Sequence, residues 1–495
     1  MAPPIRSEAP VAALPKKLLD RFAAVVGADN CIFEPEQLVT YECDALPHWR
    51  ARPGVVVLPK SRDEVVGVVK IAYEAGLPVV PRGSGTGLSG GAMPSAGGVL
   101  LGLSRMKRIL DIDLDNQWMS VEPGVVNLDI SKRLAPHGYY YAPDPSSAQI
   151  CSIGGNVAEN SGGAHCLKYG FTTHHVLGAE LVLANGDVIE VGGPVLDTPG
   201  YDLRGALVGS EGTLGVVTRV TIRICRMPEA TRTLLATFAS TREAGNAVSL
   251  IIASGVLPAA IEMMDKAAID AVRAVMGIDW PEVGALILMD VDGTTVEVEL
   301  TAARAEERCI AAGALSVRQP KDAAERDAMW RGRKSAFTAM GRLSPNYIVQ
   351  DGVIPRSQIA RVLTEIARLA EHYGVQVANV FHAGDGNLHP LVLYDAANTE
   401  QAHRAEQCSG EIVRLCVAAG GSITGEHGVG VDKAAYMGEM FTDADLETMH
   451  WLRCAFDPLV RFNPGKVFPT PRLCGDLPGK YQAHPAEVAG KIGRG

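Results

Sequence analysis

Hydrophobic residues in the first part of the chain form short runs separated by turns, with one clear helical pattern among them. The pattern SRDEVVGVVKIAYEAG covers 61–76, and apolar runs at 55–59 and 77–81 flank it. A capped helix between two short buried runs predicts a strand–helix–strand unit. Farther along, Asn185-Gly186 joins two strand-like runs and indicates a β-hairpin.

From Thr231 onward, apolar runs alternate with long helical patterns. Strands such as LLATF and ALILMDVDG stand between helices that we expect at 241–254, 296–312 and 357–373. The repeated strand–helix–strand order predicts a second α+β domain and hints at a ferredoxin-like pairing of its motifs. Prolines after Phe456 favour an extended segment that runs back over the protein surface.

The composition excludes several classes of protein. The 495 residues carry a formal net charge of −10 without a dense basic run, so we expect no nucleic acid partner. No stretch approaches the roughly 18 uninterrupted apolar residues of a transmembrane helix, and the first residues lack the compact apolar core of a signal peptide. The 10 cysteines include no C-x-x-C pair, which argues against a zinc ribbon or a ferredoxin-type cluster. We therefore expect a cytoplasmic protein without a transmembrane segment.

Three glycine-rich segments, at 82–98, 143–163 and 209–215, interrupt the strands of the first half. The first contains G-x-G-x-x-G, but Pro94 and further glycines block the helix that a Rossmann dinucleotide site requires. Backbone N–H groups of successive glycines can instead bind a pyrophosphate. Because the three loops lie between buried strands, they indicate one extended, phosphate-bearing cofactor. For the first segment taken alone, a mobile glycine loop is the alternative.

Two histidines and a glutamate in the second half form a candidate metal site. The segment VQVANVFHAGDGNLHPLVLY predicts a hairpin with His382 at the end of one strand and His389 at the start of the next. The pair alone leaves metal binding and ordinary hairpin histidines equally open. The loop SITGEHGVG offers Glu426 as a third ligand, and His427 beside it can point in another direction.

These motifs together resemble a known family. PRGSGTGLSGG, PDPSSAQICSIGGNVAENSGG and GSEGTLGVVTRV resemble the FAD-binding domain of the vanillyl-alcohol oxidase and p-cresol methylhydroxylase superfamily. FHAGDGNLHP, GEHGVG and FNPGK resemble its branch of D-lactate dehydrogenases, D-2-hydroxyglutarate dehydrogenases and FAD-linked subunits of bacterial glycolate oxidase. The last group is the one that the chain resembles most, from Arg52 to Pro469.

The resemblance implies an α+β fold. We expect an N-terminal helical segment at 1–50, a two-part FAD-binding domain at 51–228, and an α+β substrate (cap) domain with an antiparallel sheet at 229–469. The end of the substrate domain is expected to return to the flavin, and 470–495 is a tail.

The resemblance also implies which residues hold FAD. The first loop would wrap the pyrophosphate and the second would line the flavin. Glu211, Gly212 and Val217 would lie nearer the adenine, while Asn463 and Lys466 would close over the flavin. The expected residues of the first two loops are Pro81, Arg82, Gly83, Ser84, Gly85, Thr86, Gly87, Ser89, Pro145, Cys151, Ser152, Gly154, Gly155, Asn156, Asn160, Ser161, Gly162 and Gly163. Members with covalent FAD usually carry the attaching histidine in the first loop, and its absence here predicts noncovalent FAD.

In the second domain, the resemblance implies that His382, His389 and Glu426 bind a divalent metal, with Zn²⁺ as the expected ion. His427 would be the catalytic base.

The substrate carboxylate would bind Arg333, with a solvated helix face as the alternative for this residue. Asn387 would touch the substrate. Phe337 is apolar where dehydrogenases for dicarboxylates tend to be polar, so we expect a monocarboxylate.

Together these residues imply FAD-dependent oxidation of a small 2-hydroxy acid, from glycolate to glyoxylate or from D-lactate to pyruvate. The metal would assist deprotonation, and a hydride would pass to flavin N5. Electrons would leave to quinone or to an iron–sulfur subunit and a second flavoprotein-like subunit, through which the chain would reach the inner face of the membrane. The alternatives are a D-lactate dehydrogenase acting alone with a cytochrome or quinone acceptor, a metal-dependent hydrolase, and a noncatalytic FAD scaffold.

Overall fold

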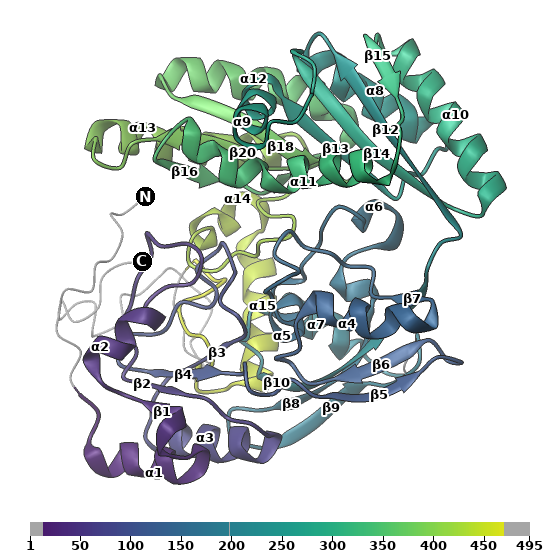
Figure 1. Cartoon of the computed structure of the whole chain (residues 1–495). Helices are drawn as coiled ribbons and strands as arrows, with labels where there is room; N and C mark the ends of the chain where they lie inside the picture. The colour runs from purple at the N-terminus through teal and green to yellow at the C-terminus, as the bar shows by residue number, and fades with distance from the viewer. Residues whose placement is uncertain (1–12, 198, 470–495) are drawn as a thin grey trace.

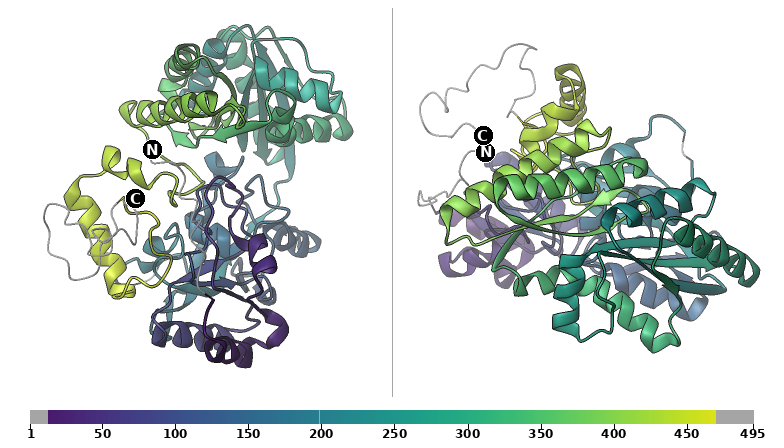
Figure 2. Two further views of the ribbon diagram at one scale, coloured as in Figure 1. Left: turned by 90° about the vertical axis from the view of Figure 1, so that its left-hand side faces the viewer. Right: turned by 90° about the horizontal axis from the view of Figure 1, so that it is seen from above.

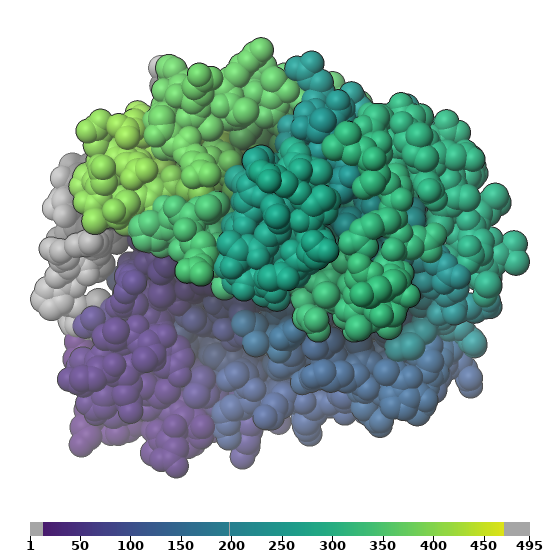
Figure 3. Space-filling view, turned by 45° about the horizontal axis from the view of Figure 1, so that its top comes forward, coloured from purple at the N-terminus to yellow at the C-terminus, as the bar shows by residue number. Residues whose placement is uncertain are grey.

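Two domains are stacked face to face in the computed structural model (Figure 1), which describes residues 13–197 and 199–469. The expected tail at 470–495 lies outside the described residues. The first domain is drawn in purple and blue, and the second, in teal and green, begins with β12 (Ala230–Phe238). A view at right angles (Figure 2) and a space-filling view (Figure 3) show the second domain seated on the first.

The first sheet is built around the predicted strand–helix–strand unit. β2 (Val55–Val57) and β3 (Val79–Arg82) lie parallel to β4 (Val99–Gly102), one on each side, and α3 (Arg62–Glu74) connects β2 to β3. The side chain of Ser61 accepts a hydrogen bond from the N–H of Glu64 and caps this helix. The helix and its N-terminal cap therefore lie where the sequence predicted them.

Residues 13–50, the described part of the N-terminal segment, pack on the first domain. β1 (Cys31–Ile32) adds to the first sheet, antiparallel to β2. The helix α1 (Lys16–Val26) packs on α3, with Phe22 in the shared core. A short helix, α2 (Pro35–Leu38), follows β1.

The second sheet of the first domain is antiparallel, in the order β5-β6-β10-β8-β9. The Asn185-Gly186 turn joins β8 to β9 as predicted, and Gly186 takes a φ of +84°. The elements of this part are β5 (Ile109–Asp113), β6 (Trp118–Val121), α4 (Asn127–Leu134), β7 (Tyr139–Tyr140), α5 (Ile153–Glu159), α6 (Cys166–Tyr169), β8 (Val176–Val182), β9 (Val188–Gly192), α7 (Leu203–Leu207), β10 (Val216–Arg223) and β11 (Cys225–Arg226).

The second glycine-rich segment differs from the prediction, because part of it is the helix α5 and not a loop. Gly154 lies in the first turn, where a Cβ atom would stand 2.7 Å from the Cβ of Pro123. Glycine lowers helix propensity by about 1 kcal/mol relative to alanine, but here it lets the helix approach Pro123 closely. Asn160, with a φ of +51°, then ends the helix.

The second domain contains a large antiparallel sheet in the order β15-β12-β14-β13-β18-β19-β17, and β20 pairs with both β16 and β18. Strands β15, β12, β14 and β13, with the helices α8 and α10, have the order of a ferredoxin-like unit, into which α9 is inserted. The strands are β13 (Ala260–Asp265), β14 (Ala285–Gly293), β15 (Ser316–Arg318), β16 (Asn346–Val349), β17 (Gly352–Val353), β18 (Gln376–His382), β19 (Asn387–Leu388) and β20 (Pro390–Tyr394).

Helices cover both faces of this sheet. One core cluster joins the sheet to α8, α10, α12 and α13, and another joins it to α9 and α11. Of these, α11 lies along the side next to the first domain (Figure 1). The helices are α8 (Thr241–Ala253), α9 (Lys266–Met276), α10 (Thr295–Ala311), α11 (Ala323–Ala339), α12 (Ile359–Tyr373) and α13 (Thr399–Ala418). Within 13–197 and 199–469, no helix combines the length and apolarity needed to span a bilayer.

The C-terminal segment returns to the first domain through α14 (Met437–Met440) and α15 (Asp443–Phe456), drawn in yellow (Figure 1). The expected extended path over the surface is wrong. Phe462 is fully buried beside β3, where Val79 exchanges backbone hydrogen bonds with Arg461 and Asn463. The segment bends at Asn463, whose φ is +41°. The preceding residue, Phe462, completes the core at the edge of the first sheet.

Candidate active site

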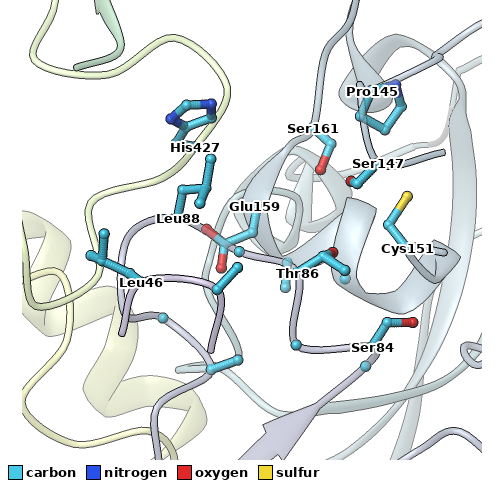
Figure 4. A pocket seen from close by; sticks show the side chains of 18 of the residues that line it. Leu46, Ser84, Thr86, Leu88, Pro145, Ser147, Cys151, Glu159, Ser161 and His427 are labelled. Atoms are coloured by element: carbon cyan, nitrogen blue, oxygen red, sulfur yellow. The ribbon is translucent and has the colours of Figure 1, made fainter. Parts of the chain in front are cut away.

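A cavity of about 880 Å³ lies where the two domains meet. The glycine-rich segments of the first domain form one wall, and α11, β16 and the loop at 424–430 contribute the other. The close-up (Figure 4) shows the ring of His427 on the side of the second wall, with Ser84 and Cys151 on the opposite side. A volume in this range suits a cofactor or a small molecule.

Most of the residues predicted to hold FAD line this cavity. They are Pro81, Arg82, Gly83, Ser84, Gly85, Thr86, Gly87, Pro145, Cys151, Ser152, Gly154, Gly155, Asn156, Ser161, Glu211, Gly212 and Val217. The predicted residues that are not among the lining residues are Ser89, Asn160, Gly162, Gly163, Asn463 and Lys466.

Several predicted residues hold the wall together. The guanidinium of Arg82 donates to the carbonyl oxygens of Tyr41 and Cys43, so it ties the first loop to the N-terminal segment. Lys466 Nζ donates to the carbonyl oxygen of Met93 at 2.6 Å, and the Asn463 amide donates to that of Gly91 at 2.8 Å. These contacts fix the end of the first glycine-rich segment from behind.

Sequence reasoning missed two parts of the cavity. Residues 45–48 and Arg50 line it, but their sequence, ALPH and Arg, gives no signal of a ligand. Glu159 also lines it, as an acid within NVAENSGG, which is a signal that could have been used. Burial, followed by the charges of Glu211 and Asp44, raises the pKa of Glu159 well above its usual value.

Glu211 lines the cavity and also lies under the loop at 424–430, and its expected place nearer the adenine stays a prediction. Its carboxylate accepts the N–H groups of Val429 at 2.6 Å and Gly430 at 2.7 Å. Two charge-assisted hydrogen bonds of this length attach the first domain firmly to the Glu-His loop.

The predicted metal ligands come together. His382 ends β18, and His389 stands between β19 and β20. Glu426 Oε1 lies 3.2 Å from His382 Nε2 and 3.5 Å from His389 Nε2, and all three residues are buried. In a tetrahedral site with bonds of about 2.0–2.1 Å, neighbouring ligand atoms lie about 3.3 Å apart.

Atoms without a hydrogen-bond partner are a second sign of a metal site at this position. Both ring nitrogens of His389 and Oε2 of Glu426 are buried without a hydrogen-bond partner among the described residues. Buried polar atoms are normally satisfied. Two imidazoles and a carboxylate with unused lone pairs fit one divalent metal ion.

Asp351, another residue that sequence reasoning missed, shapes the Glu-His loop. This fully buried carboxylate accepts the N–H groups of Gly425 at 3.0 Å, Glu426 at 3.2 Å and His427 at 2.9 Å, and Lys433 Nζ lies 3.3 Å away. Burial alone would raise the pKa of Asp351, but the ammonium group of Lys433 opposes this effect, and the pKa lies well below its usual value. These contacts all meet Oδ2 of Asp351, while Oδ1 lies 3.4 Å from His389 Nε2, so Asp351 stands at the edge of the His-His-Glu group.

His427 faces the cavity as predicted. Its ring stacks on that of His389, with centroids 5.0 Å apart and an interplanar angle of 6°. Burial lowers the pKa of His427 to about 4, against the opposing effect of Asp351. The imidazole is therefore neutral at pH 7 and able to accept a proton.

The two predicted substrate contacts lie away from the cavity wall. Arg333 is 4% exposed, and its Nε donates to Glu262 Oε2 at 2.7 Å. Asn387 is 1% exposed and packs against Gly425. On α11, the residues that line the cavity are Lys334 and Phe337.

Comparison with known proteins gives the family. Residues 53–192 match the family described as FAD binding domain, and residues 227–467 match FAD linked oxidases, C-terminal domain. The glycolate oxidase subunit GlcD of Escherichia coli (strain K12) is 47% identical over 450 residues, which cover 91% of this chain and 90% of that protein. This chain belongs to the FAD-linked oxidase family of GlcD.

Other relatives of this FAD-linked oxidase agree. A D-lactate dehydrogenase of Archaeoglobus fulgidus is 35% identical over 417 residues, or 83% of this chain and 91% of that protein. The structure of p-cresol methylhydroxylase with substrate bound matches with a TM-score of 0.76 at 20% identity, over 92% of this chain and 98% of that chain. The expected superfamily and the α+β fold are therefore confirmed, and the first domain of the oxidase binds FAD.

We predict that the FAD of this oxidase is noncovalent, because the histidines that line the cavity in the described residues are His48, His389 and His427, all outside the first glycine-rich segment. Precipitation of the purified protein with acid should leave the yellow chromophore in the supernatant. A pellet that stays yellow, with a flavin-bearing peptide found by mass spectrometry, would contradict this prediction.

Proposed function

We propose that this oxidase converts a small 2-hydroxy acid, glycolate or D-lactate, to the 2-oxo acid. The observation that carries the proposal is the position of the neutral His427 beside a buried His-His-Glu donor set, across the cavity from the FAD-binding loops. The relatives named glycolate oxidase subunit and D-lactate dehydrogenase support this class of substrate.

We propose that His382, His389 and Glu426 hold one divalent metal ion, with Zn²⁺ as the expected ion, and that the cavity wall of the first domain holds FAD. When bound, the metal supplies a Lewis acid that lowers the pKa of the substrate hydroxyl, and FAD supplies the hydride acceptor. His427 accepts the hydroxyl proton. Its Nδ1 faces Asp351 Oδ2 at 3.9 Å, which leaves Nε2 for the substrate. The substrate loses this proton and the hydride of its α-carbon, so a two-electron oxidation is balanced.

The proposed substrate is a monocarboxylate. Among the described residues of the second domain that line the cavity, Lys334 is the one Lys or Arg, and Phe337, Tyr347 and Val349 supply apolar wall. Phe337 also packs edge-on against His389, with ring centroids 5.9 Å apart. Lys334 can pair with one carboxylate, and a second carboxylate would face the apolar side chains of this wall.

We further propose that electrons leave the flavin for partner subunits, an iron–sulfur subunit and a second flavoprotein-like subunit, in a cytoplasmic complex. Support comes from the printed name of the relative, which calls it a subunit. The sequence itself has no C-x-x-C pair for a cluster of its own.

Anaerobic stopped-flow reduction of the flavin tests the proposed function directly. Glycolate and D-lactate should both bleach the flavin, since one methyl group is worth only about 1–3 kcal/mol, or roughly 10–200-fold, in a pocket. L-lactate and D-2-hydroxyglutarate should be poor substrates. A clear lead for either of the last two, or no reduction by any 2-hydroxy acid, would contradict the proposal.

The metal site is tested by His389→Ala. This variant should lose its divalent metal and keep its flavin, because the metal ligands lie in the second domain and most of the flavin wall lies in the first. Metal content by mass spectrometry and flavin absorbance measure the two separately. The exposed His403 on α13 offers a matched control, and His403→Ala should keep both groups. Active wild-type protein without metal would refute the site.

The base role is tested by His427→Asn. Flavin reduction should slow by roughly 10²–10⁴-fold, as is usual when a general base is lost, while metal and flavin contents stay at the wild-type level. The exposed His372 on α12 provides the control His372→Asn, for which we expect an unchanged rate. A loss of less than about tenfold would assign the base role to another group.

A further inference from the structure

A single carboxylate, Glu262, stands inside an otherwise apolar stretch of β13. It is 1% exposed, and its neighbours Ile261 and Met263 belong to the hydrophobic core. A buried carboxylate is unfavourable unless it is paired and hydrogen-bonded. The reason for an acid at this position must therefore be found in its partners.

The first partner is a proposed metal ligand. In the register of β13 with β18, Glu262 stands directly opposite His382. Glu262 Oε1 lies 2.6 Å from His382 Nδ1. This contact fixes the orientation of the imidazole ring, so that its other nitrogen, Nε2, points toward the Glu-His loop. Nε2 is the atom that lies 3.2 Å from Glu426 Oε1.

The second partner is Arg333 on α11. Its Nε donates to the other oxygen, Glu262 Oε2, at 2.7 Å, and Nη2 of the same guanidinium lies 2.5 Å from that oxygen. The side chains of Glu262, His382 and Arg333 are all at most 5% exposed. Both carboxylate oxygens are thus used, one for the imidazole and one for the guanidinium.

We infer that Glu262 is a positioning residue that holds the ring of His382 in the orientation needed for the metal, and that Arg333 supports this carboxylate. The inference rests on the proposed metal site. Carboxylates that orient metal-binding histidines in this way typically contribute 10–100-fold to metal affinity.

The test is the affinity for Zn²⁺ of metal-depleted flavoprotein, measured by competition with a chromophoric chelator. Glu262→Gln should weaken binding by roughly 10–100-fold while the flavin content is unchanged. Asp290 on β14 provides a matched control, because it is also a buried carboxylate paired with an arginine of α11, Arg326, at 2.5 Å. Asp290→Asn should leave the affinity for Zn²⁺ within about threefold of wild type.

Glu262→Gln leaves Arg333 buried without its charge partner, which can prevent folding. The double variant Glu262→Gln, Arg333→Met removes both charges and should retain flavin while its affinity for Zn²⁺ stays reduced. Wild-type affinity in a folded Glu262 variant would overturn the inference alone. Absence of saturable Zn²⁺ binding in the wild-type protein would instead refute the proposed metal site on which the inference rests.

The role of Arg333 has its own readout. Arg333→Met should lower the affinity for Zn²⁺, because it leaves Glu262 without its guanidinium. Unchanged Zn²⁺ affinity together with a large rise in the KM for glycolate would indicate that Arg333 binds the substrate, and would contradict the inference.

Discussion

The Glu-His loop at 424–430 is held by two buried carboxylates that come from different domains. Asp351 of the second domain accepts the N–H groups of residues 425–427, and Glu211 of the first domain accepts those of 429 and 430. Hydrogen bonds to a charged acceptor are stronger than those between neutral groups, so these five contacts restrict the conformations of the loop. Glu426 and His427 lie in this clamped stretch, and their placement depends on both domains being in position.

Local sequence patterns predicted much of the fold. The cap at Ser61, the alternating runs around Asn185-Gly186 and the long helices of the second domain act through neighbours close in sequence, and these elements appear where expected. The helix α5 and the bend at Asn463 were not predicted, because both depend on distant partners. Gly154 has no side chain because Pro123 lies too close for one, and Phe462 is buried because its segment pairs with β3.

The candidate site shows the same difference between features set by nearby residues and features set by distant partners. The His382–His389 hairpin and the Glu-His loop could be recognised because their residues cluster in sequence. Glu262, Asp351 and Lys433 could not, since each is one charged residue in an unremarkable stretch and acquires its role from strands or loops far along the chain. Arg333 was predicted to bind the substrate carboxylate, and in the structure its Nε donates to Glu262, a carboxylate 71 residues away that the sequence pattern could not pair with it.

Close contacts with both domains explain why GEHGVG contains three glycines. A Cβ at Gly425 would lie 2.6 Å from the side chain of Asn387, one at Gly428 would lie 2.0 Å from Glu159, and one at Gly430 would lie 2.0 Å from the carbonyl oxygen of Ser89. The first contact is with the histidine hairpin, and the other two are with the FAD-binding domain. The backbone around His427 therefore lies close to both domains, and a side chain at Gly425 or Gly430 would shift His427 relative to its neighbours in one domain or the other. Asn387 and Ser89, two residues predicted to touch substrate or cofactor, also limit the space that this loop occupies.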